Sequence, residues 1–343
     1  MKNSIATTKN SADILKFIMS ALVVATHTGL FAPHLTPVVR LAVPVFFVLS
    51  GYFFFSKVNA IDSSKGKRDY LLKSVRHNLQ LYGFWFVLLS PITFYIRDYF
   101  SEGFFSGILS MIQDFVLGST FQASWYITAL IIGLTGLFYL SQKCSNTILV
   151  IVGVLFYIPA LLSSNYLFIP TLSDTTIEIY EAVTEVLLLP CRNFFAGIIY
   201  LVIGKILAES SDSPGTKKDG VMSLICFAAV VGEYLALNFG SVHIKDTDCF
   251  IMLPLTAYYL CRWTLSLKAD ISCTVLLRKL STLSYCSHMA VFMIVGKFLS
   301  VLDIPDFENI IVFALTLGLT WALGLIILKA EKLKAFGFLK YSH

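Results

Sequence analysis

Two ionisable side chains eleven positions apart, Lys16 and His27, are the residues in this sequence best suited to chemistry. Eleven residues of an α-helix turn through about 1100°, which is about 20° more than three full turns, so both side chains would lie on one face, about 16 Å apart along the axis. Asp13 and Ser20 fall on the same stripe. A neutral imidazole can accept a proton near pH 7, so His27 is suited to be a general base. The alternative is a structural polar seam that fixes helix packing.

A second polar cluster surrounds His288, because Ser281, Ser284 and Tyr285 precede it at helical spacing. Such a group could bind a substrate. Small polar side chains also form hydrogen bonds between membrane helices, which is the structural alternative. Glu233 is a further ionisable residue inside an apolar stretch, and the sequence does not reveal its partner.

These residues must be positioned by a membrane-embedded bundle. Of the 343 residues, 57% are hydrophobic and only 14% are charged, and the mean hydropathy is +0.77. Soluble chains carry about 25% charged residues. The composition therefore excludes a soluble cytosolic enzyme, a disordered protein and a nucleic-acid-binding protein.

Long apolar stretches predict an all-α integral membrane protein of about ten transmembrane helices, because a chain in hydrocarbon must pair its backbone groups internally. The stretch from Gly103 to Phe121 contains Gln113 and Asp114, so we expect it to be an interfacial or re-entrant helix. The expected spans are Ile14–Phe31, Val38–Phe55, Leu79–Ile96, Ser124–Leu140, Thr147–Leu162, Pro190–Ala208, Val221–Phe239, Cys249–Leu267, Thr282–Ser300 and Asn309–Leu328.

The distribution of basic residues predicts the orientation of these spans. Most of the 26 lysines and arginines fall in segments that share one side if the N-terminus is cytoplasmic, as the positive-inside rule requires. We therefore expect both termini in the cytoplasm. The chain reads as one transmembrane domain over residues 1–343, with a basic cytoplasmic loop at 57–78 and extracytoplasmic loops at 97–123 and 163–189.

The seven cysteines are scattered, mostly within apolar stretches, and no CxxC pattern occurs. Buried cysteines of this kind usually behave as small hydrophobic residues. We therefore expect neither a disulfide framework nor a metal site.

Six short motifs occur in order along the chain. They are Lys16-x10-His27, Val43-Pro-Val-Phe-Phe-Val-Leu-Ser-Gly-Tyr52, Lys73-Ser-Val-Arg76, Trp125-Tyr126, Arg192-Asn-Phe-Phe with Gly197 and Gly204 after it, and Ser281-Thr-Leu-Ser-Tyr285-Cys-Ser-His288. In this order they resemble the membrane acyltransferase-3 family from about residue 10 to residue 330. Lys16 stands where an arginine is commoner in the family, and the basic pair begins with lysine.

This resemblance implies an O-acyltransferase, most often an O-acetyltransferase, that modifies a sugar hydroxyl of a cell-surface polysaccharide or of its lipid-linked precursor. The donor would be acetyl-CoA or another acyl-CoA, with no tightly bound cofactor. The expected partners are membrane lipid and the glycan acceptor, and the expected location is the bacterial cytoplasmic (inner) membrane. The sequence does not indicate an oligomeric state.

The resemblance also implies roles for individual residues. His27 and Lys16 become the catalytic candidates, and Lys73 and Arg76 the candidates for binding the phosphates of the donor. Each has a structural alternative. Basic residues in such segments follow the positive-inside rule, Trp125 suits an interfacial belt as well as a sugar platform, and Arg192 could snorkel to the interface. The candidates for substrate binding are Asp13, Ser50, Trp125, Arg192, Tyr285 and His288.

Other polytopic proteins provide the competing functions. A multi-pass transporter or exporter of a small solute or glycan usually shows internal repeats and broken spans in both halves, and neither is evident here. A glycan polymerase or flippase usually carries a larger outer loop. A regulatory membrane domain of the same family, fused elsewhere to an amino-acid racemase, is less favoured because no fused catalytic domain is visible.

Overall fold

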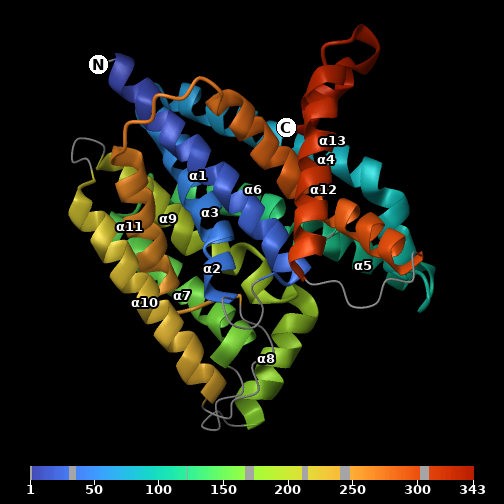
Figure 1. The fold of residues 1–343 in the computed structure, drawn as a ribbon. Helices are drawn as coiled ribbons and strands as arrows, with labels where there is room; N and C mark the ends of the chain where they lie inside the picture. Colours follow the sequence, from blue (N-terminus) through green and yellow to red (C-terminus); the bar gives the residue numbers. More distant parts are fainter. Residues whose placement is uncertain are drawn as a thin grey trace.

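The computed structural model describes residues 2–30, 36–121, 123–166, 174–210, 215–239, 248–301 and 309–343. Within these ranges every regular element is a helix. The N-terminal end of α1 lies at the top of the bundle and α8 at its lower end, with α10 and α11 on one side and α4, α5 and α13 on the other (Figure 1). The α-helices are α1 (Lys2–Thr28), α2 (Thr36–Val39), α3 (Ala42–Asn59), α4 (Ser64–Ile96), α5 (Phe104–Val116), α6 (Trp125–Leu140), α7 (Asn146–Leu161), α8 (Asp174–Leu187), α9 (Phe194–Glu209), α10 (Lys217–Phe239), α11 (Leu253–Ser266), α12 (Thr274–Val301) and α13 (Asn309–Ala330).

Each expected span coincides with a helix of the bundle: α1, α3, α4, α6, α7 and α9 to α13. Among the described residues, six helical stretches are long and apolar enough to cross a membrane, or seven if the bent pair formed by α8 and α9 is one span. Several of the others are shorter, such as α6 with 16 residues. The fold is thus all-helical and multi-pass, and the number of ten spans stays a prediction.

The basic segment at 57–78 is mostly not a loop, contrary to the expectation from its polarity. Helix α4 begins at Ser64 and runs for 33 residues, and the Ser63 side chain accepts a hydrogen bond from the Gly66 amide at its N-terminus. The expected loops at 97–123 and 163–189 likewise contain α5 and α8. Polar helix-forming sequence extends beyond the apolar part of a span, so hydropathy alone places the helix boundary too late.

Helix α5 has the character expected of an interfacial helix, because its outer face is apolar and exposed while its one carboxylate is buried. Phe105 is 81% exposed, whereas Asp114 is buried. The Asp114 carboxylate accepts a hydrogen bond from Tyr99 at 2.7 Å and pairs with Arg97 at 3.1 Å. Burial and the hydrogen bond to Asp114 raise the pKa of the Tyr99 phenol above its ordinary value.

Helices α3 and α9 pack backbone to backbone at the centre of the bundle through two facing glycines. A Cβ atom on Gly51 would lie 2.9 Å from the Leu201 carbonyl oxygen, and one on Gly204 would lie 2.7 Å from the Tyr52 amide nitrogen. Small residues allow membrane helices to approach this closely. Gly51 and Gly204 therefore serve close helix packing.

We expect Gly204→Ala to destabilise the protein, because the added methyl group must push two backbones apart. Gly136→Ala is the matched control, since Gly136 is also helical but a Cβ atom added to it would have no neighbour within 4 Å, and alanine favours a helix over glycine. Thermal unfolding of the purified protein in detergent should show a lower Tm for Gly204→Ala and an unchanged or slightly higher Tm for Gly136→Ala. Equal Tm values for the two variants would contradict the close-packing account.

Candidate active site

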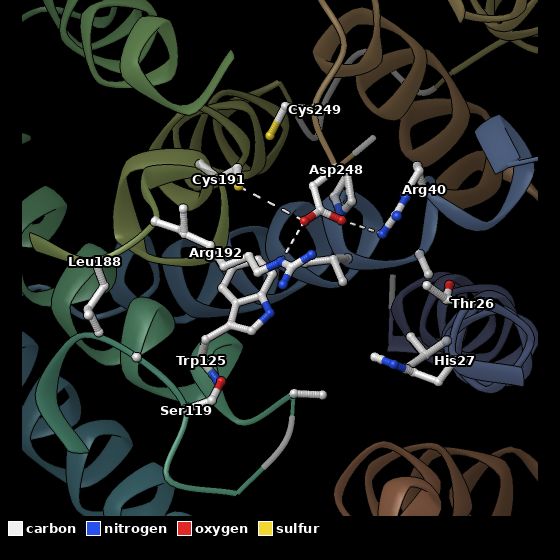
Figure 2. Close-up of a pocket in the computed structure, with 18 of the residues that line it drawn as sticks. Thr26, His27, Arg40, Ser119, Trp125, Leu188, Cys191, Arg192, Asp248 and Cys249 are labelled. Carbon is white, nitrogen blue, oxygen red and sulfur yellow. Dashed lines mark hydrogen bonds and ion pairs between the residues drawn. The ribbon is translucent and has the colours of Figure 1, made fainter. Parts of the chain in front are cut away.

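A cavity of about 890 Å³ lies where the C-terminal end of α1 meets the N-terminal ends of α3, α6 and α9. Helix α8, helix α12, the residues just before α6 and those just before α11 also contribute to its wall. The helix ends that meet here are those that the charge distribution predicts on the extracytoplasmic side. Polar and charged side chains line the cavity among apolar ones, and Figure 2 shows several of them.

His27 projects into this cavity from the last turn of α1 (Figure 2). The helix ends one residue later because Gly29 adopts a φ of +70°, and the Leu30 amide then bonds back to the Ala25 carbonyl. A positive φ is the usual end of a helix and favours glycine. The Gly29 carbonyl accepts a hydrogen bond from Asn309 at 2.9 Å, which fixes this end of α1 to α13.

The ring of His288 packs against the ring of His27, with the two ring centroids 5.0 Å apart. It is completely buried. Its Nδ1 lies 2.8 Å from the carbonyl oxygen of Tyr285 and 3.0 Å from that of Ser284, so Nδ1 must carry the proton. Its Nε2 is then an acceptor, and no donor among the described residues reaches it.

Tyr285 and Trp125, which are candidates for substrate binding, also line the cavity. The Tyr285 hydroxyl donates to the Ala123 carbonyl, and the Trp125 amide donates to the Ser119 hydroxyl at 3.1 Å. Ser50 lies outside the lining. Its hydroxyl is 2.9 Å from that of Tyr126, so the structure gives Ser50 a role in joining α3 to α6.

Arg192 enters the cavity wall as one of two arginines that hold a single carboxylate. Its Nε donates to Asp248 at 2.6 Å, and Arg40 pairs with the other oxygen of Asp248 (Figure 2). The Asp248 side chain is only 12% exposed. Pairing with two guanidinium groups offsets the cost of removing this carboxylate from water. The snorkelling alternative for Arg192 is thus unnecessary.

Sequence reasoning missed Arg40 and Asp248. Arg40 lies inside the expected span Val38–Phe55, and an ionisable residue within a span is by default a functional candidate. The position of Arg40 within a span could therefore have identified it as a candidate. Asp248 directly precedes an expected span, and only the fold shows that it meets Arg40 and Arg192.

Lys16 lies in a different part of the bundle from His27. Their spacing on α1 separates them by about 16 Å along the axis, and Lys16 does not line the cavity. Its Nζ lies 4.7 Å from the centroid of the Phe53 ring. Asp13, three residues earlier, pairs with Arg278 at 3.5 Å. Lys16 and Asp13 therefore belong to a second polar site nearer the N-terminal end of α1, and Lys16 does not touch His27.

The donor-binding candidates are also separate from the cavity. Lys73 and Arg76 are exposed on α4, one turn apart on the same face, and neither lines the cavity. The structure therefore brings His27, His288, Tyr285, Trp125 and Arg192 together. It leaves Lys73 and Arg76 on a separate exposed surface, on α4.

Glu233 has a structural partner that the sequence did not reveal. Its carboxylate accepts the Ile251 amide at 2.7 Å and the Met252 amide at 3.3 Å, just before α11 begins. A carboxylate at a helix N-terminus is stabilised by free amides and by the helix dipole. Among the described residues, no group of three histidine, cysteine or acidic side chains could hold a metal ion.

Comparison with known proteins gives relatives that are named as racemases. An amino-acid racemase of Enterococcus faecalis is 26% identical over 72% of this chain and 35% of its own length. A serine/alanine racemase of Enterococcus gallinarum is 24% identical over 64% of this chain and 31% of its own length. A further amino-acid racemase of Enterococcus faecalis is 22% identical over 94% of this chain and 46% of its own length. The chain thus spans less than half the length of each of these relatives.

No solved structure gives a significant match to the chain. The acyltransferase domain family named acyltransferase-3 matches residues 9–329, nearly the whole sequence. The motif order, the multi-pass helical bundle and this match agree, and the chain belongs to the acyltransferase-3 family of membrane acyltransferases.

Proposed function

We propose that this protein transfers an acyl group, most often acetyl, from a cytoplasmic acyl-CoA to a sugar hydroxyl of a cell-surface polysaccharide or its lipid-linked precursor. We place it in the bacterial inner membrane with ten spans and both termini in the cytoplasm. The observation that carries the proposal is the position of His27, in the wall of a large cavity with polar and apolar lining, at the predicted outer end of a family-matched bundle.

In this proposal His27 is the general base. The imidazole accepts the proton of the sugar hydroxyl as its oxygen attacks the thioester carbonyl, the C–S bond breaks, and the proton passes to the departing thiolate. The His288 ring packs against that of His27, and its own Nδ1 proton is donated to the backbone carbonyls of Ser284 and Tyr285. That arrangement keeps His288 fixed in one orientation while His27 faces the cavity.

The other lining residues suit a sugar acceptor. Trp125 offers an aromatic face, and the charged ends of Arg192 and Asp248 offer donors and acceptors for hydroxyl groups. Their mutual pairing at 2.6 Å holds both side chains in place before a substrate binds. Preorganised polar groups reduce the entropy cost of orienting a substrate.

On the opposite side, Lys73 and Arg76 would bind the donor phosphates. Two cationic side chains three residues apart on an exposed helix face can approach one diphosphate. Lys16 lies on α1 about three turns before His27, toward the predicted cytoplasmic end of that helix, so we assign it to the donor side of the reaction. For His27 to act on the thioester, the acyl-bearing end of the donor must reach the cavity while its phosphates stay on the cytoplasmic surface.

The alternative function is a multi-pass transporter or exporter of a small solute or glycan. Both functions predict a polar cavity, but only the acyltransferase predicts an ester on the product. Mass spectrometry of surface glycans from cells with and without the gene distinguishes the two. An acetyl increment that is removed by mild alkali supports the enzyme, and identical glycans would contradict it.

We expect His27→Gln to leave folded protein in the membrane and to reduce acylation by about 10²–10⁴-fold, because an amide can form a hydrogen bond but cannot take up the proton. The control is His77→Gln, since His77 is exposed on α4 and outside the cavity. Transfer of radiolabelled acetyl from acetyl-CoA to membrane glycan is the measurement. Wild-type transfer by His27→Gln at matched expression would reduce His27 to a packing residue.

We expect replacement of Lys73 and Arg76 by alanine to weaken acyl-CoA binding, seen as a raised KM for the donor at unchanged expression. The pair Lys65 and Arg68 is a matched control, because it has the same charges and spacing, lies on the same helix and is also exposed. Its replacement by alanine should leave the KM for the donor nearly unchanged. Equal losses from the two double variants would indicate a diffuse charge effect and remove the motif-specific role.

We expect Lys16→Arg to retain most of the activity and Lys16→Ala to lose it, because the donor-side role of Lys16 needs a positive charge. The same acetyl-transfer assay checks this expectation, with the amount of membrane-inserted protein as the reference. Activity of Lys16→Ala close to that of the wild type would show that the charge is not needed.

We expect reporter fusions at Asp174 and Lys217 to report opposite sides of the membrane, since α8 begins at the predicted outer end and α10 at the predicted cytoplasmic end. A paired alkaline phosphatase and green fluorescent protein assay reports both sides. The same side for both positions would show that the number of spans between them is even and would refute the ten-span topology.

A further inference from the structure

Two cysteines that the proposed reaction does not use lie in the same wall of the cavity. Cys191 belongs to the short 3-10 helix Pro190–Arg192 that leads into α9, and Cys249 precedes α11. Both are buried in the protein, both line the cavity, and both are present as thiols in the structure. They are separated by almost sixty residues in the sequence, so only the fold brings them to one place.

Two consecutive serines hold the backbones of these cysteines. The Cys191 amide donates to the Ser163 hydroxyl at 2.8 Å, and the Cys249 amide donates to the Ser164 hydroxyl at 2.9 Å. Since Ser163 and Ser164 are neighbours in the chain, their Cα atoms are about 3.8 Å apart. The two cysteine backbones are thus anchored at adjacent points of the same turn after α7.

The side chains on either side of this anchor are also joined. Arg192 follows Cys191, Asp248 precedes Cys249, and the two form an ion pair at 2.6 Å. The Cys191 Sγ lies 4.0 Å from an Asp248 carboxylate oxygen. Figure 2 shows the sulfur of Cys249 directed toward Cys191.

We propose that Cys191 and Cys249 form an oxidisable pair that closes into a disulfide when a small-molecule disulfide enters the cavity. One cysteine thiolate attacks the oxidant, which forms a mixed disulfide and releases one small thiol. The other cysteine then attacks the mixed disulfide and releases the second small thiol. The protein loses two thiol protons and two electrons and gains one S–S bond, and the oxidant is reduced to two thiols.

This bond would join the start of α9 to the start of α11 across the cavity wall. Because Arg192 and Asp248 are the chain neighbours of these cysteines, the bond would also restrict the movement of their ion pair, which lies in the candidate acceptor site. The cavity opens at the end predicted to be extracytoplasmic, where disulfides form and persist. The pair departs from the sequence-based expectation that the cysteines take part in no disulfide, because spacing along the chain does not reveal two thiols anchored on adjacent serines.

The test uses the purified full chain in detergent, treated with 2-hydroxyethyl disulfide, then alkylated under denaturing conditions and mapped by mass spectrometry without reduction. One variant retains only Cys191 and Cys249, with serine at the other five positions. The matched control retains Cys191 and Cys286, which are also both buried in the structure. The wild-type chain is mapped in parallel, so a folding defect in a variant does not decide the result.

We expect a peptide linked through Cys191 and Cys249 in the wild-type chain and in the first variant, and no linked peptide in the control. The oxidised wild type should also melt at a higher temperature than the reduced form, because the bond restricts the unfolded chain. The proposal is overturned if both thiols are fully alkylated after oxidation. It is also overturned if Cys191 carries only the small thiol while Cys249 stays reduced. Both results are independent of the acyl-transfer activity.

Discussion

In hydrocarbon a charged or strongly polar side chain must find its partner inside the protein, and this requirement organises the half of the bundle that contains the cavity. Asp248 shows it most clearly, because its carboxylate is held between Arg40 and Arg192 where three separate segments of the chain meet. The pairing satisfies three charges at once and fixes the wall of the cavity. Trp125 and His27 line the same cavity.

The centre of the bundle meets the same requirement with small residues instead of charges. Gly51 and Gly204 let α3 and α9 approach until their backbones touch, and a hydroxyl pair between Ser50 and Tyr126 joins α3 to α6. Helix α3 is therefore held on two sides, and residues of its N-terminal half line the cavity. A well-supported scaffold is what a positioned functional site needs.

Much of this organisation could be predicted from the sequence, because hydropathy indicates which segments lie in the membrane and the distribution of basic residues indicates their orientation. Every expected span coincides with a helix, and the motif order alone pointed to the family that the comparison confirms. The site was predicted in part. His27, His288, Tyr285, Trp125 and Arg192 do share one region, whereas Lys16 shares a helix face with His27 but lies about three turns away.

What the sequence could not show was long-range pairing. Nothing in the spacing of the chain connects Arg40 with Asp248, Glu233 with the amides before α11, or Cys191 with Cys249. Helix boundaries in polar sequence were equally hidden, since α4 continues through a segment whose composition suggested a loop. Such features depend on which helices become neighbours, and periodicity within one helix carries no information about that.

In the proposed reaction His27 removes the proton of the acceptor hydroxyl, and the pH dependence of acyl transfer tests this role most directly. With purified protein and saturating donor, the wild-type rate should fall on the acid side as one group becomes protonated, since a protonated imidazole cannot act as a base. The small residual rate of His27→Gln should lack this acid limb. The same acid limb in His27→Gln would contradict the role of His27 as the base and assign the titrating group to another residue.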